Sequence, residues 1–358
     1  MADLPVLRLD EGGGSKVRRW WEMLRRLRSL KRQHDLTISF LSGMNLLNAL
    51  AGQRVRTVIS ERGSKRHDIG MSKRERLIWT HLLDPLTYWR AGKVVTASEG
   101  LAHEIVTANP WAAGKVISIE GTVKAAALVD AGDLPVEPEI EEMVEFETIV
   151  TFGRLHIQKG YEFLLHAFER VHNSRPNARL LLIGDGDERE RLRDVAAELG
   201  IRVGTNASEA DVIFTGVKTD PVRYARIGRV FAFPSLYEGL PNALIEAIAA
   251  GVPVLASDCP WGPRSILSGG SLGYDEELTL PTRLAHGILM PLPDDPKALK
   301  IWADELEQAL EQSAPRTPKR DRLEAVKKYD IEQTGPRWLH LATETLEPSE
   351  DARGASQQ

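Results

Sequence analysis

Short apolar segments alternate with longer amphipathic segments between residues 148 and 257, and this alternation restricts the chain to few folds. Apolar runs with the length of buried strands occupy residues 148–152, 179–183, 212–214, 230–234 and 253–257. Segments with helical spacing lie between them, at 161–173, 188–199, 221–227 and 242–250. Strands that alternate with helices are typical of a parallel sheet covered by helices. A shorter series of the same kind covers residues 36–119, so the sequence predicts two α/β domains.

An acidic segment with two prolines, residues 130–147, separates the two series and lacks a clean period, so we interpret it as the linker. We expect an N-terminal domain at 1–143 and a C-terminal domain at 144–325. A C-terminal helix at 326–346 is expected to return to the N-terminal domain, and the polar tail at 347–358 is expected to be disordered. The length of 358 residues agrees with two domains of about 150 residues each.

Composition excludes several classes of protein. The single cysteine, Cys259, cannot form an internal disulfide, and no run of eighteen apolar residues is present to span a membrane. The first residues lack the basic flank and apolar stretch of a secretory signal. These features predict a cytoplasmic protein.

The charge is unevenly distributed along the chain. Residues 1–129 hold 21 Lys and Arg against 12 Asp and Glu, and the remaining residues hold 25 against 39. Residues 15–34 are the most basic segment, an amphipathic helix in which eight of twenty residues are Lys or Arg, with Trp20 and Trp21 on it. This helix is interpreted as a core helix with a solvated outer face or as a contact with an anionic membrane. Nucleic acid is a third reading, which no nucleic-acid-binding motif supports.

The turn at residues 153–160 follows the first strand of the second series. It carries Arg154 and Lys159 between Gly153 and Gly160, and a helix begins directly after it. Cations, glycines that admit a close ligand and a helix N-terminus together favour phosphate binding. A solvated loop with two cations explains the same residues equally well. The turn is not a P-loop, because the GxxxxGK[ST] pattern is absent.

A second motif, SLYEGLPNALIE, begins at Ser235 at the end of a strand and runs into a helix. Glu238 precedes the helix, Glu246 lies on it eight positions later, and the residues between expose backbone N–H groups at the helix start. Carboxylates suit the hydroxyls of sugars and ribose, since each oxygen accepts charge-assisted hydrogen bonds. Two solvated charges are the plainer interpretation, but Glu246 stands among aliphatic residues, where a charge needs a partner.

Residues 148 to about 260 resemble the C-terminal domain of the retaining glycosyltransferases of family 4, which have the GT-B fold. The matching segments are TIVTFGRLHIQKG, LLLIGDGDERERL, VIFTG and FPSLYEGLPNALIEAIAAGVPVLAS, in the order and spacing of that family. The resemblance implies an α/β chain of GT-B type, with two Rossmann-like domains that face a cleft. The segments expected before the SFL strand are short, so it also implies a reduced N-terminal domain.

The resemblance implies roles for the residues of both motifs. Arg154 and Lys159 correspond to the pair that binds the donor diphosphate, Glu238 to the glutamate that contacts the transferred sugar, and Glu246 to the one that contacts the ribose. We therefore expect Arg154, Lys159 and Glu238 to be catalytic. The other residues expected on the donor side are Gly153, Gly184, Val217, Lys218, Gly239, Leu240, Pro241, Asn242 and Glu246.

The chemistry implied by the family needs neither a metal nor a cofactor. A departing nucleoside diphosphate develops negative charge, which two cations and a helix N-terminus stabilise. Asp185-Gly-Asp187 matches the DxD metal motif of a different glycosyltransferase fold, but it lies in a turn between a strand and a helix. We name no general base, because the departing phosphate is thought to help deprotonate the acceptor in this family.

The N-terminal half resembles the family less specifically. The segments TISFLSGMN, VISER and KVVTASEG carry the acceptor-side candidates Asn45, Ser60, Glu61, Arg62 and Ser98, for which turn and helix caps are equally good explanations. Several elements that the family places before the SFL strand are not found ahead of it here, so we expect either a reduced N-terminal domain or a misassigned start. The asparagine-proline pair that the family has after the strand at 115–119 is replaced by Glu120-Gly121.

The sequence therefore predicts a retaining, metal-independent glycosyltransferase that moves a hexose or N-acetylhexosamine from a nucleotide sugar, a UDP-sugar above all. The acceptor is expected to be a glycan or a lipid-linked acceptor in cell-surface polysaccharide biosynthesis, reached from the cytoplasm or the inner face of the membrane. The alternative is a nucleotide-sugar-binding protein without transferase activity, because of the short N-terminal domain. An epimerase of the same fold is disfavoured by the paired glutamates.

Overall fold

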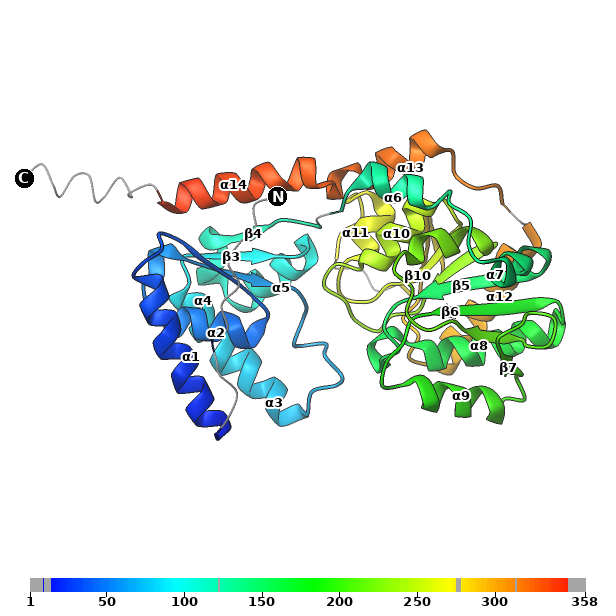
Figure 1. Ribbon diagram of the computed structural model, residues 1–358, viewed down its shortest axis with the longest axis horizontal. Coiled ribbons are helices and arrows are strands. Elements are labelled where there is room, and N and C mark those ends of the chain that lie inside the picture. The colour runs from blue at the N-terminus through cyan, green and yellow to red at the C-terminus, as the bar shows by residue number, and fades with distance from the viewer. Residues whose placement is uncertain (1–8, 10–13, 122, 275–277, 313, 347–358) are drawn as a thin grey trace, which may run out of the picture. The chain divides into compact units, whose positions relative to one another are not determined.

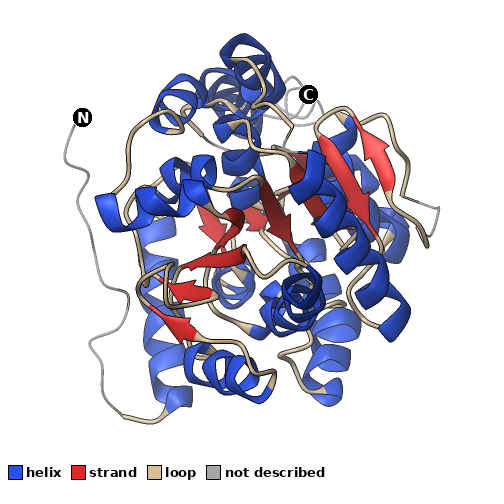
Figure 2. Ribbon diagram, turned by 90° about the vertical axis from the view of Figure 1, so that its right-hand side faces the viewer, coloured by secondary structure: helices blue, strands red, loops and turns tan. Residues whose placement is uncertain are grey.

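The computed structural model of the protein describes residues 9, 14–121, 123–274, 278–312 and 314–346, and the expected tail at 347–358 lies outside this range (Figure 1). The chain divides into two compact units. The described residues of unit 1 fall within 1–66, 71–119 and 335–358, and those of unit 2 within 67–70 and 120–334. Strands lie between helices in the ribbon of Figure 2, as expected of α/β units.

Unit 1 is built on a parallel sheet. In its described residues the sheet has four strands in the order β1-β2-β3-β4. The strands are β1 (Thr37–Phe40), β2 (Thr57–Glu61), β3 (Lys93–Thr96) and β4 (Val116–Ser118). The helices are α1 (Lys16–Lys31), α2 (Ser42–Leu50), α3 (Lys73–Ile78), α4 (Asp84–Arg90), α5 (Glu99–Ala108) and the part of α14 (Ile331–Leu346) from residue 335 on. Leu341 of α14 is buried with Val58, Val95 and Ile119, so α14 contributes to the core of unit 1.

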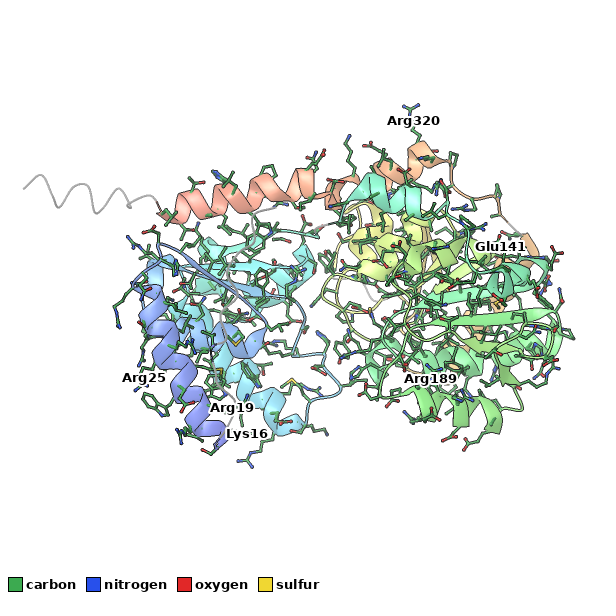
Figure 3. All side chains as sticks on the ribbon, viewed as in Figure 1. Lys16, Arg19, Arg25, Glu141, Arg189 and Arg320 are labelled. Carbon is green, nitrogen blue, oxygen red and sulfur yellow. The ribbon has the colours of Figure 1, made fainter. Side chains whose placement is uncertain are left out.

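The basic helix α1 buries one face and exposes the other. Ser15 caps it by accepting a hydrogen bond from the backbone of Arg18, and Leu27 packs on Leu47 of α2. Val17 and Trp21 are 70% and 64% exposed, and Lys16, Arg19 and Arg25 project from the helix in Figure 3. No helix in the described part of the chain is long and apolar enough to cross a bilayer.

Unit 2 holds a larger sheet. Among its described residues the sheet has eight strands in the order β11-β12-β10-β9-β5-β6-β8-β7, and β11 is antiparallel to its neighbour β12. The strands are β5 (Glu147–Phe152), β6 (Ala178–Ile183), β7 (Val203–Gly204), β8 (Val212–Phe214), β9 (Val230–Phe233), β10 (Val254–Ser257), β11 (Thr282–Leu284) and β12 (Gly287–Met290). The helices are α6 (Ala125–Ala131), α7 (Pro138–Glu141), α8 (Tyr161–Ser174), α9 (Arg189–Glu198), α10 (Asn242–Ala250), α11 (Pro263–Ser268), α12 (Pro296–Gln312), α13 (Lys319–Val326) and the first residues of α14.

The strand order of unit 2 contains a switch point. The chain runs from β5 to β6 on one side, and it later returns to place β9 on the other side of β5. Connections on either side of such a point diverge, which leaves a crevice at the carboxyl ends of the two strands where ligands bind in open α/β sheets. Central strands are apolar on both faces, with Ile149 facing one buried cluster and Val150 the other. This burial holds the carboxyl edge of β5 and β9 in place.

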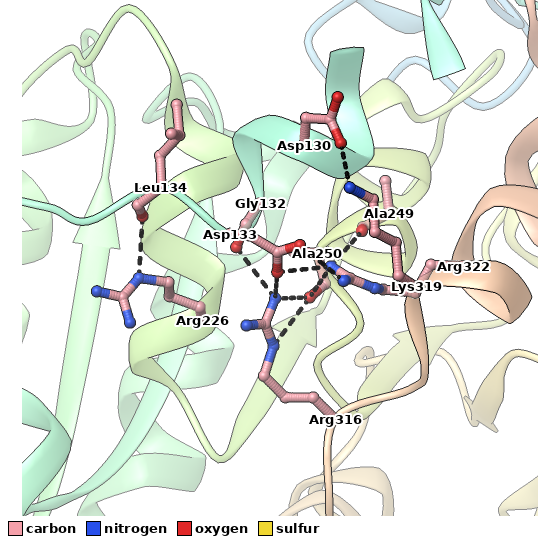
Figure 4. Close-up of polar contacts among 10 residues, drawn as sticks. All are labelled: Asp130, Gly132, Asp133, Leu134, Arg226, Ala249, Ala250, Arg316, Lys319 and Arg322. Atoms are coloured by element: carbon pink, nitrogen blue, oxygen red, sulfur yellow. Dashed lines mark hydrogen bonds and ion pairs between the residues drawn. The ribbon is translucent and has the colours of Figure 1, made fainter. Parts of the chain in front are cut away.

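The acidic segment 130–147 is not a linker, contrary to the expectation from its composition. It contains the end of α6, the whole of α7 and a 3₁₀ turn at Glu142–Glu145, all within unit 2. Met143 is fully buried, and Asp133 lies between Arg316 and Arg322 in Figure 4, with an ion pair of 2.9 Å to Arg322. The chain passes between the units at Ile119 and Glu120, so the boundary expected at 143 lies inside unit 2.

Candidate functional site

The two motifs from the sequence emerge at the switch point of unit 2. The turn at 153–160 follows β5, and the segment 234–241 follows β9, which pairs with β5 in parallel. The two segments therefore leave the sheet next to each other, at its carboxyl edge.

Three glycines bring the backbone together at this edge. The N–H of Gly153 donates to Ile183 O at 2.9 Å, and the N–H of Gly184 donates to Gly216 O at 2.9 Å. A Cβ atom on Gly184 would lie 1.9 Å from the carbonyl oxygen of Gly153. Glycine is needed at 184 because no side chain fits between the two turns. The backbone at the ends of β5, β6 and β8 is thus closely packed and hydrogen-bonded.

The loops after β5 and β9 are joined by direct contacts. The side-chain amide of Gln158 donates to the backbone carbonyl of Tyr237 at 2.7 Å. The backbone carbonyl of Gln158 accepts from the N–H of Leu236 at 2.8 Å. Gly160 has φ 65°, and a Cβ atom there would lie 2.0 Å from Pro234 O. The two loops are thus held together by backbone and side-chain hydrogen bonds. Sequence spacing does not show these contacts, because the residues are far apart in the chain.

Lys159 and Glu238 meet between the loops. Lys159 Nζ lies 2.7 Å from Glu238 Oε1, and the two side chains are 16% and 8% exposed. The same ammonium lies 5.3 Å from the centre of the Phe233 ring, within the range of a cation–π contact. The backbone of Glu238 is fixed as well, since its N–H donates to Pro260 O and its carbonyl accepts from Trp261 N. The structure thus brings together a cation and a carboxylate that the sequence separates by 79 positions.

Glu246 lies on α10, in surroundings that disfavour its charge. Burial raises the pKa of Glu246, the nearby Lys159 ammonium opposes this rise, and Asp220 adds to it. Its carboxylate makes no hydrogen bond to any described residue. A half-buried carboxylate with unused acceptor capacity is suited to a ligand hydroxyl.

The remaining donor-side candidates surround α10 and the adjacent strand ends. Pro241 is the N-cap of α10 and provides no side-chain cap. The first backbone hydrogen bond of the helix is donated by Leu244 N to Pro241 O, so the N–H groups of Asn242 and Ala243 precede the hydrogen-bonded turns. Gly239 is buried and Leu240 is half-buried before it. Arg154 is exposed; its charge acts on the pKa of Tyr237, lowering it against the larger effects of burial and of Asp68, which raise it. This places Arg154 near the loop that carries Glu238.

Val217 and Lys218 follow β8 as expected, but only Val217 is open to solvent without a charged partner. Val217 is 76% exposed, whereas Lys218 Nζ forms an ion pair of 2.8 Å with Glu137. Asp185 of the DxD match pairs with Arg189 at 3.1 Å and accepts from the backbone of Gly186. Nowhere in the described ranges do three or more His, Cys, Asp or Glu residues form a group that could hold a metal. A metal-independent reaction stays a prediction.

The acceptor-side candidates lie in unit 1, where three of them form one buried network. Asn45 donates to Ser60 O at 2.9 Å and to Glu61 Oε1 at 3.1 Å. Glu61 also pairs with Lys65 at 3.0 Å. Ser98 caps α5 by accepting from Leu101 N, and burial lowers the pKa of Arg62. Within unit 1 these contacts give Asn45 and Ser98 structural partners of their own.

Comparisons with known proteins agree with this architecture. Residues 147–311, slightly under half of the chain, match the family model described as glycosyl transferases group 1. An uncharacterized glycosyltransferase of Methanocaldococcus jannaschii is 31% identical over 212 residues, which cover 55% of this chain and 50% of that protein. A 4-alpha-N-acetylgalactosaminyltransferase of Campylobacter jejuni, whose name specifies an undecaprenol diphosphate-linked acceptor, is 27% identical over 41% of this chain and 38% of its own. The chain thus spans about half of the first of these relatives and less of the second.

Solved structures match over more of the chain. HepE of Anabaena, solved with UDP and glucose, matches with a TM-score of 0.67 and 16% identity over 90% of this chain and 81% of its own. TarM of S. aureus matches with a TM-score of 0.62 and 16% identity over 89% of this chain and 59% of its own. The chain therefore has the GT-B fold. Within it, residues 147–311 are related in sequence to the glycosyl transferases of group 1 and carry the loops that form the candidate site.

Proposed function

We propose that the protein transfers a hexose or N-acetylhexosamine from a nucleotide sugar, a UDP-sugar above all, to a glycan or lipid-linked acceptor in cell-surface polysaccharide biosynthesis. The observation that carries the proposal is the meeting of Lys159 and Glu238 at the switch point, within a segment related to glycosyl transferases. UDP in the HepE structure and an undecaprenol diphosphate-linked acceptor in the name of the Campylobacter enzyme support the choice of donor and acceptor class.

In this proposal the donor diphosphate lies over the start of α10, against Arg154 and Lys159. The ribose hydroxyls donate to Glu246, and a hydroxyl of the transferred sugar donates to Glu238. The bond between the anomeric carbon and the β-phosphate oxygen breaks, and the cations and the helix N-terminus stabilise the charge that develops on that oxygen. The acceptor oxygen bonds to the anomeric carbon on the same face, and its proton passes to the departing phosphate. The reaction retains configuration and uses no metal.

The first experiment is a screen of UDP- and GDP-sugars by mass spectrometry, for hydrolysis and for transfer to lipid-linked acceptors. UDP binding is then measured by calorimetry in Lys159→Ala and Glu246→Ala, with Lys300→Ala on the exposed side of α12 as the control. Both site variants are expected to lose measurable UDP affinity, and the control to keep it. Unchanged UDP affinity in both would refute the site. UDP-sugar binding without turnover would instead favour a nucleotide-sugar-binding protein.

We further propose that the protein works on the cytoplasmic face of a membrane, with α1 on an anionic surface. Its exposed face combines Val17 and Trp21 with several arginines, a composition suited to the lipid headgroup region. Sedimentation with phosphatidylglycerol vesicles tests the contact. Trp21→Ala should reduce binding, whereas Trp111→Ala, at another exposed tryptophan of unit 1, should not. Equal binding of both variants, or equal binding to neutral vesicles, would contradict the assignment.

A further inference from the structure

Among the residues that the structure describes, Glu238 is the ion-pair partner of Lys159. The ammonium lies 2.7 Å from Oε1 of Glu238 and 5.3 Å from the centre of the Phe233 ring. Under the proposed function the diphosphate of the donor binds to the same ammonium. Lys159 is therefore already neutralised by a carboxylate at the place where an anionic ligand has to bind.

A diphosphate and Glu238 compete for this ammonium. An approaching phosphate is repelled by the Glu238 carboxylate unless the ion pair opens, because like charges at contact distance repel strongly at a site shielded from water. Glu246 adds a second carboxylate that acts on the same ammonium. The backbone of Glu238 is bonded to Pro260 and Trp261, so on this side the ion pair opens through the side-chain torsions of Glu238.

We propose that Glu238 is the counter-ion that the donor diphosphate displaces from Lys159, and that a hydroxyl of the donor sugar then replaces Lys159 as the partner of Glu238. The inference rests on the proposed function. It assigns to this ion pair the discrimination between a nucleotide sugar and the free nucleoside diphosphate. A nucleotide sugar supplies both groups and leaves no charge unpaired.

A free nucleoside diphosphate supplies only the phosphate. It leaves the carboxylate of the Glu238 side chain, which is 8% exposed, without a partner. An unpaired buried carboxylate is unfavourable, so the site binds the product more weakly than the donor and releases it after transfer. The exchange of partners thus gives the site a preference that neither Lys159 nor Glu238 provides alone.

The test is a set of dissociation constants for UDP, UDP-glucose and UDP-N-acetylglucosamine in the full-length protein. Glu238→Gln removes the competing charge and keeps the shape of the side chain. UDP affinity is expected to rise at least about tenfold, which corresponds to ~1.4 kcal/mol, while affinity for the sugar nucleotides rises less. The ratio between UDP-sugar and UDP affinity therefore falls. Asp220→Asn, which removes a neighbouring charge that does not touch Lys159, is the control and should leave that ratio unchanged.

A third variant separates failure of this inference from failure of the proposed function. Lys159→Met is expected to lose UDP and UDP-sugar affinity together. If it does so while Glu238→Gln leaves UDP affinity unchanged or lowers it, the exchange of partners is wrong and the site stands. If Lys159→Met keeps full UDP affinity, the diphosphate binds elsewhere and both are wrong. Far-UV circular dichroism and the melting temperature of each variant establish that it is folded.

Discussion

Replacing Gly160 with alanine tests how closely the loops after β5 and β9 are joined. Gly160 has φ 65°, where an L-residue is strained, and a Cβ atom there would lie 2.0 Å from Pro234 O and 3.1 Å from the carbonyl carbon. The left-handed conformation costs roughly 1–2 kcal/mol for alanine. Relief of the clash requires the loops to separate, at a further cost of about 1–3 kcal/mol, as for an overpacked core.

Gly200 provides a matched control in the same unit. It also has a left-handed φ, of 72°, but a Cβ atom there would meet nothing within 4 Å. Gly200→Ala therefore carries the conformational cost alone, and the entropy change of the unfolded chain is common to both variants. The free energy of unfolding should be lower in Gly160→Ala than in Gly200→Ala by about 1–3 kcal/mol, the cost of the clash.

Urea unfolding followed by far-UV circular dichroism measures the difference, and calorimetry measures UDP binding to the folded variants. Separation of the loops moves Lys159 relative to Glu238, so Gly160→Ala is expected to bind UDP more weakly than Gly200→Ala. Equal unfolding free energies and equal UDP affinities in the two variants would refute the close approach of the loops.

Two further predictions concern buried and exposed charges. Burial raises the pKa of Asp84 to about 6, against the opposing charge of Lys65, so the stabilisation from its neutral form is complete below pH ~4 and lost as pH rises through about 6. The free energy of unfolding of Asp84→Asn, measured in urea relative to wild type, should therefore be higher at pH ~7.5 than at pH ~4 by up to about 3 kcal/mol. Parallel pH profiles of the two proteins would contradict this. Asp133→Ala, which leaves the buried Arg322 without its carboxylate, should cost about 1–3 kcal/mol. Asp130→Ala, at an ion pair 62% exposed on both sides, should cost well under ~1 kcal/mol, so equal melting temperatures of these two variants would contradict the distinction.

The regular part of the fold could be predicted because burial leaves a periodic pattern. The strands of unit 2 that are buried on both faces, such as β5 and β6, are continuous apolar runs, and their positions follow from the sequence to within a residue or two. β7 and β11 are strands of two and three residues at the sheet edges. They are too short to produce a periodic pattern, so the sequence does not predict them.

The acidic segment shows where composition misleads. Asp133 and Glu141 suggest a solvated linker when only their neighbours in sequence are considered. Their partners, Arg322 and Arg226, lie far along the chain, so the pairing depends on the tertiary fold. Charges are predictable as exposed only while no distant residue of opposite charge packs against them.

The candidate site, too, could be predicted from the sequence only in part. The types of residue in both motifs and their resemblance to a family placed Lys159 and Glu238 in one site. The contact between their side chains depends on β9 pairing with β5, and the role of Gln158 as a bridge depends on a loop geometry that leaves no periodic signal. The sequence predicts which charged and polar groups the site contains, and the sheet topology determines which of them come into contact.

The return of α14 to unit 1 has a consequence for the order of events during synthesis. Apart from His67–Gly70, unit 2 is one continuous stretch of chain from Glu120 to Thr334. It can therefore fold while the rest of the chain is still being synthesised on the ribosome. The core of unit 1 includes Leu341, and Trp338 packs on Phe40 with ring centres 6.0 Å apart. Although its strands are translated first, unit 1 can complete its core only after unit 2 has been made.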